Sequence, residues 1–570
     1  MTKYLYLFTK GFFLLLALPV VVVLSCSKRV LDEQPLDFLA PENAYNTLPG
    51  ISQGAAGLYT SVRQNWFYGI NDNATQLYGM GTDLAYYGED PGSARFLTDY
   101  STFFTPSNPY VSGFWTLNYQ LIQRVNVLIK GISAAAPGIW NSPGQKNAYL
   151  AEAMFFRAYA YRILVAFYGD VPIVTEVISS SKTDFVRAPK ADVYKLMEED
   201  LSFAAANLPQ QGKEEATGRV TQGAAWHMLS ELYLTQAKYQ LAVEAASKVI
   251  SGYRYGLMTR RFGTRLGNDV FGTGDPYFDL FGFGNHNLSE NTEAIWVIQV
   301  EPLVVGGSAA QGERVFGPAY YRMGNTPDGF KAFRGPLVNG SYTGYSDTLG
   351  RPVGWMRPTN YLAYTIWLSD WSRDIRNAEH NLKRNFYYDS PGSAFNKKKI
   401  DFSLYAPGTR NALNDTSQYI FPYFMKFVDP VHHLTDPARS GGGDNHKDLY
   451  AIRLAETLLL RAEAYVRLNN LPAAAADINQ IRTRAKATPV TPQEVNLNYI
   501  LDERARELYG EDWRPITLRR MGKLVERVKQ HNNNPKTPGA NIRDVNVLYP
   551  IPQAQIDLNI GAKMSQNPGY

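Results

Sequence analysis

Apolar residues recur at every third or fourth position along several stretches of this chain, which is the spacing of an amphipathic helix. We predict helices over residues 44–64, 113–132, 149–167 and 192–209, the last of them beginning on an Asp192 cap. The first two flank an aromatic, Gly- and Asn-rich loop at 65–90. A shorter helix is predicted near the C-terminus, in YILDERARELYG.

Two further helical stretches share a repeat signature. The first has the W-x2-L-small-x2-Y spacing of a tetratricopeptide helix pair with a small residue nine positions later: Trp226, Leu229, Ser230, Tyr233 and Ala242. A degenerate copy keeps the same offsets at Leu458, Ala462, Tyr465, Ala474 and Ile478. Each match alone could be ordinary helix-hairpin packing, but two in one register favour a helical-repeat scaffold.

The helical period is lost over residues 252–446, which are rich in Gly, Pro, Tyr and Trp. One clear extended element, EAIWVIQV, lies there at 293–300. Such a stretch is too long for a single loop, so we expect a second lobe built onto the repeats. The predicted fold class is mainly α, a tetratricopeptide-like helical-repeat scaffold with a loop-rich irregular ligand-binding lobe. We place its segments at 41–251, 252–446 and 447–570.

An uncharged run from Gly11 to Leu24 precedes Cys26, the only cysteine in the chain. The run is shorter than the roughly 20 apolar residues of a membrane span and has the length of a signal-peptide core. Val23-Leu24-Ser25-Cys26 is similar to a bacterial lipoprotein box, in which the cysteine becomes the lipid-bearing N-terminus. We therefore expect a lipoprotein signal peptide at 1–25, lipidation at Cys26 and a tether over 26–40. The alternative is that Cys26 is a chance buried thiol.

Composition narrows the class of ligand. One cysteine excludes an internal disulfide framework and a multi-cysteine metal site. The net charge of +5, without a long basic run, gives no footprint for nucleic acid. Aromatic residues make up 13% of the chain and charged residues only 19%, which suits neutral, ring-shaped ligands.

Catalytic and metal-binding signatures are not found. The chain has no H-E-x-x-H, G-x-S-x-G or phosphate-binding loop motif. The clustered ionisable residues of one Gly-rich loop lack metal-ligand periodicity, so we expect no metal and no cofactor there: His432, His433, Asp436, Asp444 and His446. A glycosidase needs only two suitably separated carboxylates, for which the loops offer Asp83, Glu89, Asp90, Asp370 and Asp374. No pair among them stands out, and we expect no catalytic residue.

Aromatic residues in loops give the stronger functional signal. A sugar ring presents a flat C–H face that stacks on an aromatic plane, while amide, carboxylate or guanidinium groups orient its hydroxyls. The candidate glycan-binding residues are Trp66, Tyr68, Asn73, Asp83, Tyr86, Tyr87, Trp355, Arg357, Asn360 and Tyr361. These rings could instead fill the core of the irregular lobe. We expect Trp367 and Trp371 in particular to be core residues, since four-residue spacing puts both on one helix face.

Several motifs in order resemble the SusD/RagB family of nutrient-binding outer-membrane lipoproteins. They are AEAMFFRAYAYRILVAFYGDVPIVTE, RAPKADVYKLMEEDLSFAAANLP, GRVTQGAAWHMLSELYL, LAETLLLRAEAY with INQIRTRA, ILDERARELYGEDWR, and YPIPQAQIDLN with QNPGY. With the lipoprotein box, the matches run from Cys26 to the last residue. One departure is Lys28-Arg29 after Ser27, where family members often carry acidic residues associated with surface export.

The resemblance implies four tetratricopeptide-like helix pairs and a loop-rich lobe that binds ligand. It further implies a lipid-anchored protein on the outer membrane that closes like a lid over a SusC-like TonB-dependent transporter and hands it oligosaccharides without chemistry. In the family, the ligand site is lined by regions that correspond to Trp66–Asp90 and Gly263–Trp371 here. Our functional hypothesis is therefore a surface glycan-binding lipoprotein. The alternatives are a surface glycoside hydrolase and a repeat scaffold that binds a protein partner.

Overall fold

The computed structural model describes residues 44–67, 77–88, 99–266, 274–302, 304–335, 337–338, 341–346, 348–401, 418–429, 432 and 444–570. Helices predominate among them. Within these ranges, no helix is both long enough and apolar enough to cross a membrane. Cys26, Tyr68 and Asn73 lie outside the described residues, as do Glu89, Asp90, His433 and Asp436.

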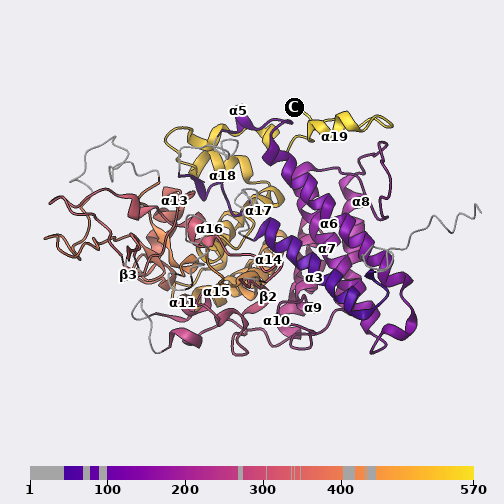
Figure 1. Cartoon of the computed structure of the whole chain (residues 1–570), viewed down its shortest axis with the longest axis horizontal. Coiled ribbons are helices and arrows are strands. Elements are labelled where there is room, and N and C mark those ends of the chain that lie inside the picture. The colour runs from indigo at the N-terminus through magenta and orange to yellow at the C-terminus, as the bar shows by residue number, and fades with distance from the viewer. Residues whose placement is uncertain are drawn as a thin grey trace, which may run out of the picture.

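Four helix pairs form the scaffold within the described ranges, and consecutive helices pack on one another along the chain. The pairs are α3 (Leu48–Trp66) with α6 (Pro109–Ala134), α7 (Gln145–Tyr168) with α8 (Lys190–Asn207), α9 (Gln222–Thr235) with α10 (Tyr239–Gly252), and α14 (Leu454–Arg467) with α15 (Leu471–Arg484). Figure 1 shows α3, α6, α7, α8 and α9 gathered on one side of the molecule, with the irregular lobe on the other. The predicted mainly-α repeat scaffold is confirmed.

The repeat signature is explained by how closely the helices approach. Ala242 and Ala474 are fully buried, and the Ser230 hydroxyl donates a hydrogen bond to the Ala242 carbonyl at 2.9 Å. A larger side chain at these positions would separate the paired helices. Asp192 is not the N-cap that we predicted, because α8 begins two residues earlier, with Pro189 at its N-cap.

The irregular lobe occupies the chain between α10 and α14. Its short helices are α11 (Pro276–Leu280), α12 (Gly312–Phe316) and α13 (Asn360–Ala363), and a 3-10 turn, η7, spans Thr365–Asp370. Its extended elements pair two by two: β2 (Ala294–Ile298) with β8 (Leu449–Arg453), β3 (Leu337–Val338) with β4 (Ser341–Tyr342), and β6 (Leu382–Lys383) with β7 (Tyr423–Phe424). Outside the lobe lies α5 (Tyr100–Phe103), and after α15 follow α16 (Leu497–Leu508), α17 (Arg514–Met521), α18 (Leu524–His531) and α19 (Gln553–Leu558). Our three-segment division of the chain stays a prediction.

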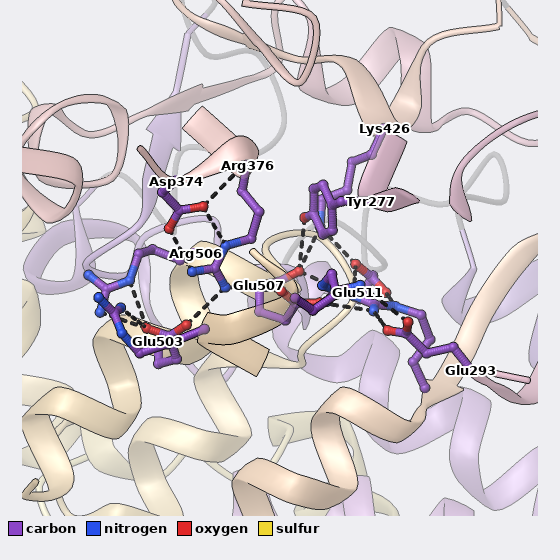
Figure 2. A network of polar contacts seen from close by, with 12 residues as sticks. Tyr277, Glu293, Asp374, Arg376, Lys426, Glu503, Arg506, Glu507 and Glu511 are labelled. Carbon is purple, nitrogen blue, oxygen red and sulfur yellow. Dashed lines mark hydrogen bonds and ion pairs between the residues drawn. The ribbon is translucent and has the colours of Figure 1, made fainter. Parts of the chain in front are cut away.

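Charged side chains of α16 are buried where the repeats meet the irregular lobe. Glu503 and Glu507 are both fully buried. The Glu507 carboxylate accepts hydrogen bonds from Arg376 of the lobe and Arg453 of β8, each at 3.0 Å, and it pairs with Arg484 of α15. Figure 2 shows the carboxylates of Glu503 and Glu507 facing the basic groups around them. Helix α16 is thus bonded to both parts of the molecule.

The network balances in charge. Its cations are Arg376, Lys426, Arg453, Arg482, Arg484 and Arg506, and its anions are Glu293, Asp370, Asp374, Glu503, Glu507 and Glu511. Desolvating so many charges is costly, and a buried ion pair adds little net stability over an apolar pair. Removing one member is different, because its partners are then left buried without a counter-charge.

We predict that Glu507→Ala will destabilise the protein by about 3–5 kcal/mol, since three guanidinium groups lose a shared acceptor. Urea and thermal unfolding followed by circular dichroism will measure the loss. Lys182→Ala is the matched control: it breaks an ion pair to Asp184 whose two side chains are 42% and 58% exposed, and it should leave the melting temperature unchanged. Equal melting temperatures for the two variants would show that the network does not hold the fold together.

Candidate functional site

A two-stranded antiparallel ribbon joins the two aromatic groups that were predicted from different parts of the chain. Strand β1 (Ala85–Tyr87) pairs with β5 (Met356–Pro358), so that Tyr86 stands opposite Arg357. The pairing continues by one hydrogen bond, from the Gly88 N–H to the Trp355 carbonyl at 2.9 Å. Tyr86 and Tyr87 are thereby brought beside Trp355 and Arg357.

One face of this ribbon carries aromatic and guanidinium groups. Directly opposed residues share a face, as do residues two apart, so Tyr86, Arg357 and Trp355 lie together. The Arg357 guanidinium carbon lies 5.8 Å from the Tyr86 ring centroid and 5.9 Å from that of Phe421. Arg314 lies 5.6 Å from the Trp355 ring. Trp355 and Arg357 are partly exposed, whereas Tyr86 is buried beneath them.

The ionisation of Tyr86 depends on its position beneath Arg357. Burial raises the pKa of Tyr86, and the neighbouring Arg357 guanidinium opposes the shift. Tyr86 is therefore neutral at physiological pH. On the other face, Met356 is fully buried and Tyr87 is partly exposed. The ribbon offers an indole plane and a fixed cation, groups that can stack on a sugar ring and bond its hydroxyls.

Asp83 and Tyr361 anchor the ribbon from behind. Asp83 is fully buried and accepts hydrogen bonds from Arg514 of α17 at 3.0 Å and Arg527 of α18 at 3.1 Å. The Tyr361 hydroxyl donates to Asp502 and accepts from Arg527, while its ring stacks on His531 at 3.8 Å. The polar atoms of both side chains are already bonded within the protein, so neither side chain offers free polar atoms to a ligand.

Trp66 is a core residue. It is fully buried at the end of α3 and stacks on Phe114 of α6, with ring centroids 5.3 Å apart and planes at 9°. This corrects our prediction that Trp66 contacts a glycan, because no part of its ring reaches the surface. Of the remaining candidates, Asn360 is exposed at the start of α13, next to β5.

The expectation for the two later tryptophans is half wrong. Trp367 is buried, and its indole N–H donates to the Leu362 carbonyl at 2.8 Å. Trp371, which we expected in the core, is 45% exposed, because the segment forms a 3-10 turn instead of a continuous α-helix. The sequence analysis therefore did not name Trp371 as a candidate binding residue. The signal that could have indicated its exposure is its position between two acidic residues, Asp370 and Asp374, whose side chains point inward.

Three of the five carboxylates considered for glycoside hydrolysis lie among the described residues, and all three are paired. Asp370 binds Arg482 at 2.7 Å, Asp374 binds Arg376 at 2.7 Å, and Asp83 binds Arg514. Figure 2 shows Asp374 directed at Arg376 inside the ionic network. None of these three carboxylates faces another across a cleft.

Of the histidine-rich loop, His432, Asp444 and His446 are among the described residues. His432 stacks on Phe283 with ring centroids 3.6 Å apart, and its Nδ1 lies 2.8 Å from Asp429. His446 lies 5.6 Å from His432, and Asp444 pairs with Arg314 at 3.5 Å. In the part of the chain that the structure describes, no group of three or more His, Cys, Asp or Glu side chains is placed to hold a metal ion.

A pocket of about 710 Å³ opens elsewhere, on the scaffold, between α6, the segment 172–185 and α19. Trp115, Tyr119 and Phe185 line it, together with Gln120. Its size is suitable for a small ligand. Much of its polar lining is already used, since both ends of the Gln123 amide bond the backbone of Ile178 and Asn559 bonds Phe185. None of the predicted site residues lies in it.

Comparisons with known proteins agree over almost the whole chain. A model described as "SusD family" matches residues 357–570, and one described as "Starch-binding associating with outer membrane" matches residues 71–234. Two relatives from Formosa agariphila are SusD-like protein P25, 25% identical over 95% of this chain and 96% of its own length, and SusD-like protein P2, 26% identical over 96% and 98%.

Solved structures share the fold. A laminarin binding SusD-like protein is 23% identical and covers 92% of this chain and 100% of its own, with a TM-score of 0.65. A SusD homolog from Bacteroides thetaiotaomicron is 20% identical over 93% and 98%, with a TM-score of 0.67. Surface glycan-binding protein A from Bacteroides fluxus is 18% identical over 92% and 100%, with a TM-score of 0.62.

We predict that Asp83 makes stability fall in acid. Burial alone would raise its pKa, but Arg514 and Arg527 lower the pKa to about 2, from an ordinary 3.8. A carboxyl with a depressed folded-state pKa contributes stability above about pH 4, and this contribution of about 2 kcal/mol is lost as the pH falls towards 2. Urea unfolding between pH 5 and pH 2 will measure it. Asp83→Asn should show a shallower fall over that window, and an unchanged slope would contradict the assignment.

Proposed function

Since this chain belongs to the SusD/RagB family, we propose that it is a surface glycan-binding lipoprotein of the outer membrane that serves a SusC-like TonB-dependent transporter in nutrient uptake. In this role it captures an oligosaccharide and presents it to the transporter without altering it. The family models that match the chain, one of them described as starch-binding and associated with the outer membrane, support this assignment.

The single observation that carries the binding site is the β1–β5 ribbon. It brings the loop after the first helix against the irregular lobe, with Trp355 and Arg357 on its partly exposed face. We assign the glycan to this face, with Tyr87 and Asn360 at its borders. Tyr68 and Asn73 remain proposed members, because they lie in the segment between α3 and β1.

Lipid anchoring rests on the sequence of the N-terminus. Cys26 follows an apolar run of signal-peptide length and is the only thiol available for acylation. The tether that we expect over residues 26–40 spans at most about 50 Å when extended, at about 3.3 Å per residue. A tether of this length lets the protein swing open over a transporter while it stays on the membrane.

We predict that Trp355→Ala and Arg357→Ala will each weaken glycan binding at least tenfold, because each removes a stacking or hydrogen-bonding group from the ribbon face. Affinity gel electrophoresis against a panel of soluble polysaccharides, starch and laminarin included, identifies the ligand, and titration calorimetry measures the change.

Gln120→Ala is the matched control, since this exposed residue lines the scaffold pocket. It should bind as the wild type does, and all variants should melt at the wild-type temperature. Loss of binding in Gln120→Ala, with both ribbon variants unchanged, would move the site to the scaffold pocket. Failure of every polysaccharide to bind the wild type would contradict the proposed function itself.

We predict that Cys26→Ala will abolish membrane anchoring, since an alanine side chain cannot form the thioether to the lipid. Cell fractionation and metabolic labelling with a palmitate analogue will follow the product, which should be unlabelled and absent from the outer membrane of cells that lack the transporter. Ser27→Ala, one residue later, should remain labelled and anchored. Persistence of Cys26→Ala in that membrane would show that another feature holds the protein there.

A further inference from the structure

An aromatic patch stands on the surface of the irregular lobe, outside the β1–β5 ribbon. Trp371 is 45% exposed, Tyr364 is 41% exposed, and Leu368 between them is 68% exposed. Exposing a tryptophan costs the free energy that its burial would provide, and such residues on a surface commonly mark a binding site. Three other tryptophans, Trp66, Trp296 and Trp367, are almost completely buried.

The backbone around Trp371 is held rigidly in this outward position. On one side, the Asp370 carboxylate accepts hydrogen bonds from Arg482 at 2.7 Å and from the Thr488 hydroxyl at 2.6 Å. On the other side, Asp374 binds Arg376 inside the ionic network (Figure 2). Because both flanks are fixed to the interior, the exposure of Trp371 is a built feature of the lobe.

A guanidinium group lies between the two rings. The central carbon of Arg384 is 4.5 Å from the Trp371 ring centroid and 5.5 Å from that of Tyr364. Asn377, which is only 5% exposed, fixes this arrangement: its amide nitrogen donates to the Trp371 carbonyl at 2.6 Å, and its amide oxygen accepts from Arg384 at 2.7 Å. One buried side chain thus links the backbone of Trp371 to the guanidinium of Arg384.

Arg384 has no carboxylate partner among the described residues. Its three side-chain hydrogen bonds go to the Ala363 carbonyl and to the carbonyl and side chain of Asn377. Within the described part of the chain, they leave two of its five N–H groups without a partner: the Nε–H, which is buried, and one N–H of Nη1. The nearby acid, Glu379, approaches Lys383 at 3.9 Å and accepts backbone N–H groups. Burial lowers the pKa of Arg384 to about 10, although the nearby Glu379 carboxylate opposes this shift, so Arg384 remains protonated at neutral pH without a direct ion pair among the described residues.

We propose that Trp371, Tyr364 and Arg384 form a subsite for an anionic sugar unit, whose ring stacks on the indole and whose carboxylate or sulfate pairs with the guanidinium. This inference rests on the proposed glycan-binding function and specifies the ligand class. A neutral sugar would use the rings but would leave the cation unpaired. An anionic sugar uses both, because a charge-assisted hydrogen bond to guanidinium is stronger than a neutral one.

Affinity gel electrophoresis with three polymers tests the subsite: polygalacturonate for the carboxylate, carrageenan for the sulfate, and laminarin as the neutral reference. We expect the wild type to bind at least one charged polymer at least tenfold more tightly than laminarin, with an affinity that falls as the ionic strength rises. Which charged polymer is retained distinguishes the two anions. Trp371→Ala should weaken that binding at least tenfold, and Arg384→Gln should remove the preference for the charged polymer.

Two conservative variants and a control separate this role from a structural one. Arg384→Lys keeps the charge and should retain part of the preference, and Trp371→Phe should retain part of the affinity. Phe330→Ala, which removes another exposed ring of the lobe, should change nothing. Melting temperatures equal to that of the wild type will confirm that the variants are folded.

The proposal is overturned if neither charged polymer binds more tightly than laminarin, or if Arg384→Gln keeps the preference. In that case, laminarin binding that depends on Trp355 leaves the proposed function standing. Failure of all polysaccharides to bind, in the wider panel as well, contradicts the proposed function together with the subsite.

Discussion

Twelve charged side chains around helix α16, eleven of them buried and Glu511 partly exposed, join the irregular lobe to the repeats. Their partners lie far apart along the chain: Arg376 reaches Glu507 across 131 residues, and Arg453 reaches Glu293 across 160. Apolar contacts tolerate sliding, whereas a buried carboxylate accepts only positions in which its guanidinium partners remain bonded. Here the bonds tie α16 to Arg376 of the lobe and to Arg453 where the lobe returns to the repeats. Asp374, three residues after Trp371, belongs to the same network.

The same network explains which parts of the molecule can be recognised from the sequence. The helices and repeats could be predicted because their sequence patterns are local, with small residues such as Ala242 and Ala474 at fixed offsets. The charged stretch ILDERARELYG has the composition of a solvated helix, yet Glu503 and Glu507 are fully buried. Apart from Arg506 of α16 itself, their counter-charges come from earlier segments that no short pattern connects to α16: Arg376, Arg453, Arg482 and Arg484. Burial of a charge is therefore a tertiary property here.

The candidate site also could be predicted only in part, because the exposure of an aromatic side chain depends on the tertiary structure. Aromatic composition drew attention to two loops, and the pairing of β1 with β5 brings them together across about 270 residues. Composition could not tell which rings face outward. Trp66 continues the apolar stripe of α3 into the core, whereas Trp371 follows a 3-10 turn and points away. Overall composition likewise gives no sign of Arg384, because the role of a single guanidinium without a direct ion pair depends on its surroundings and not on the net charge of the chain.

The way the irregular lobe joins the repeats has a consequence for how such proteins diversify. Its chain leaves after α10 and returns through β8 directly into α14, which packs on α10, and β2 clamps the return by pairing with β8. The lobe is thus an insertion whose two ends are neighbours. The entropy of closing a long insertion grows only slowly with its length, so segments between β2 and β8 can lengthen, shorten or be replaced at little cost to the solenoid. One unchanging frame can then carry many ligand specificities, provided that each new lobe keeps the acidic and basic groups that reach α16.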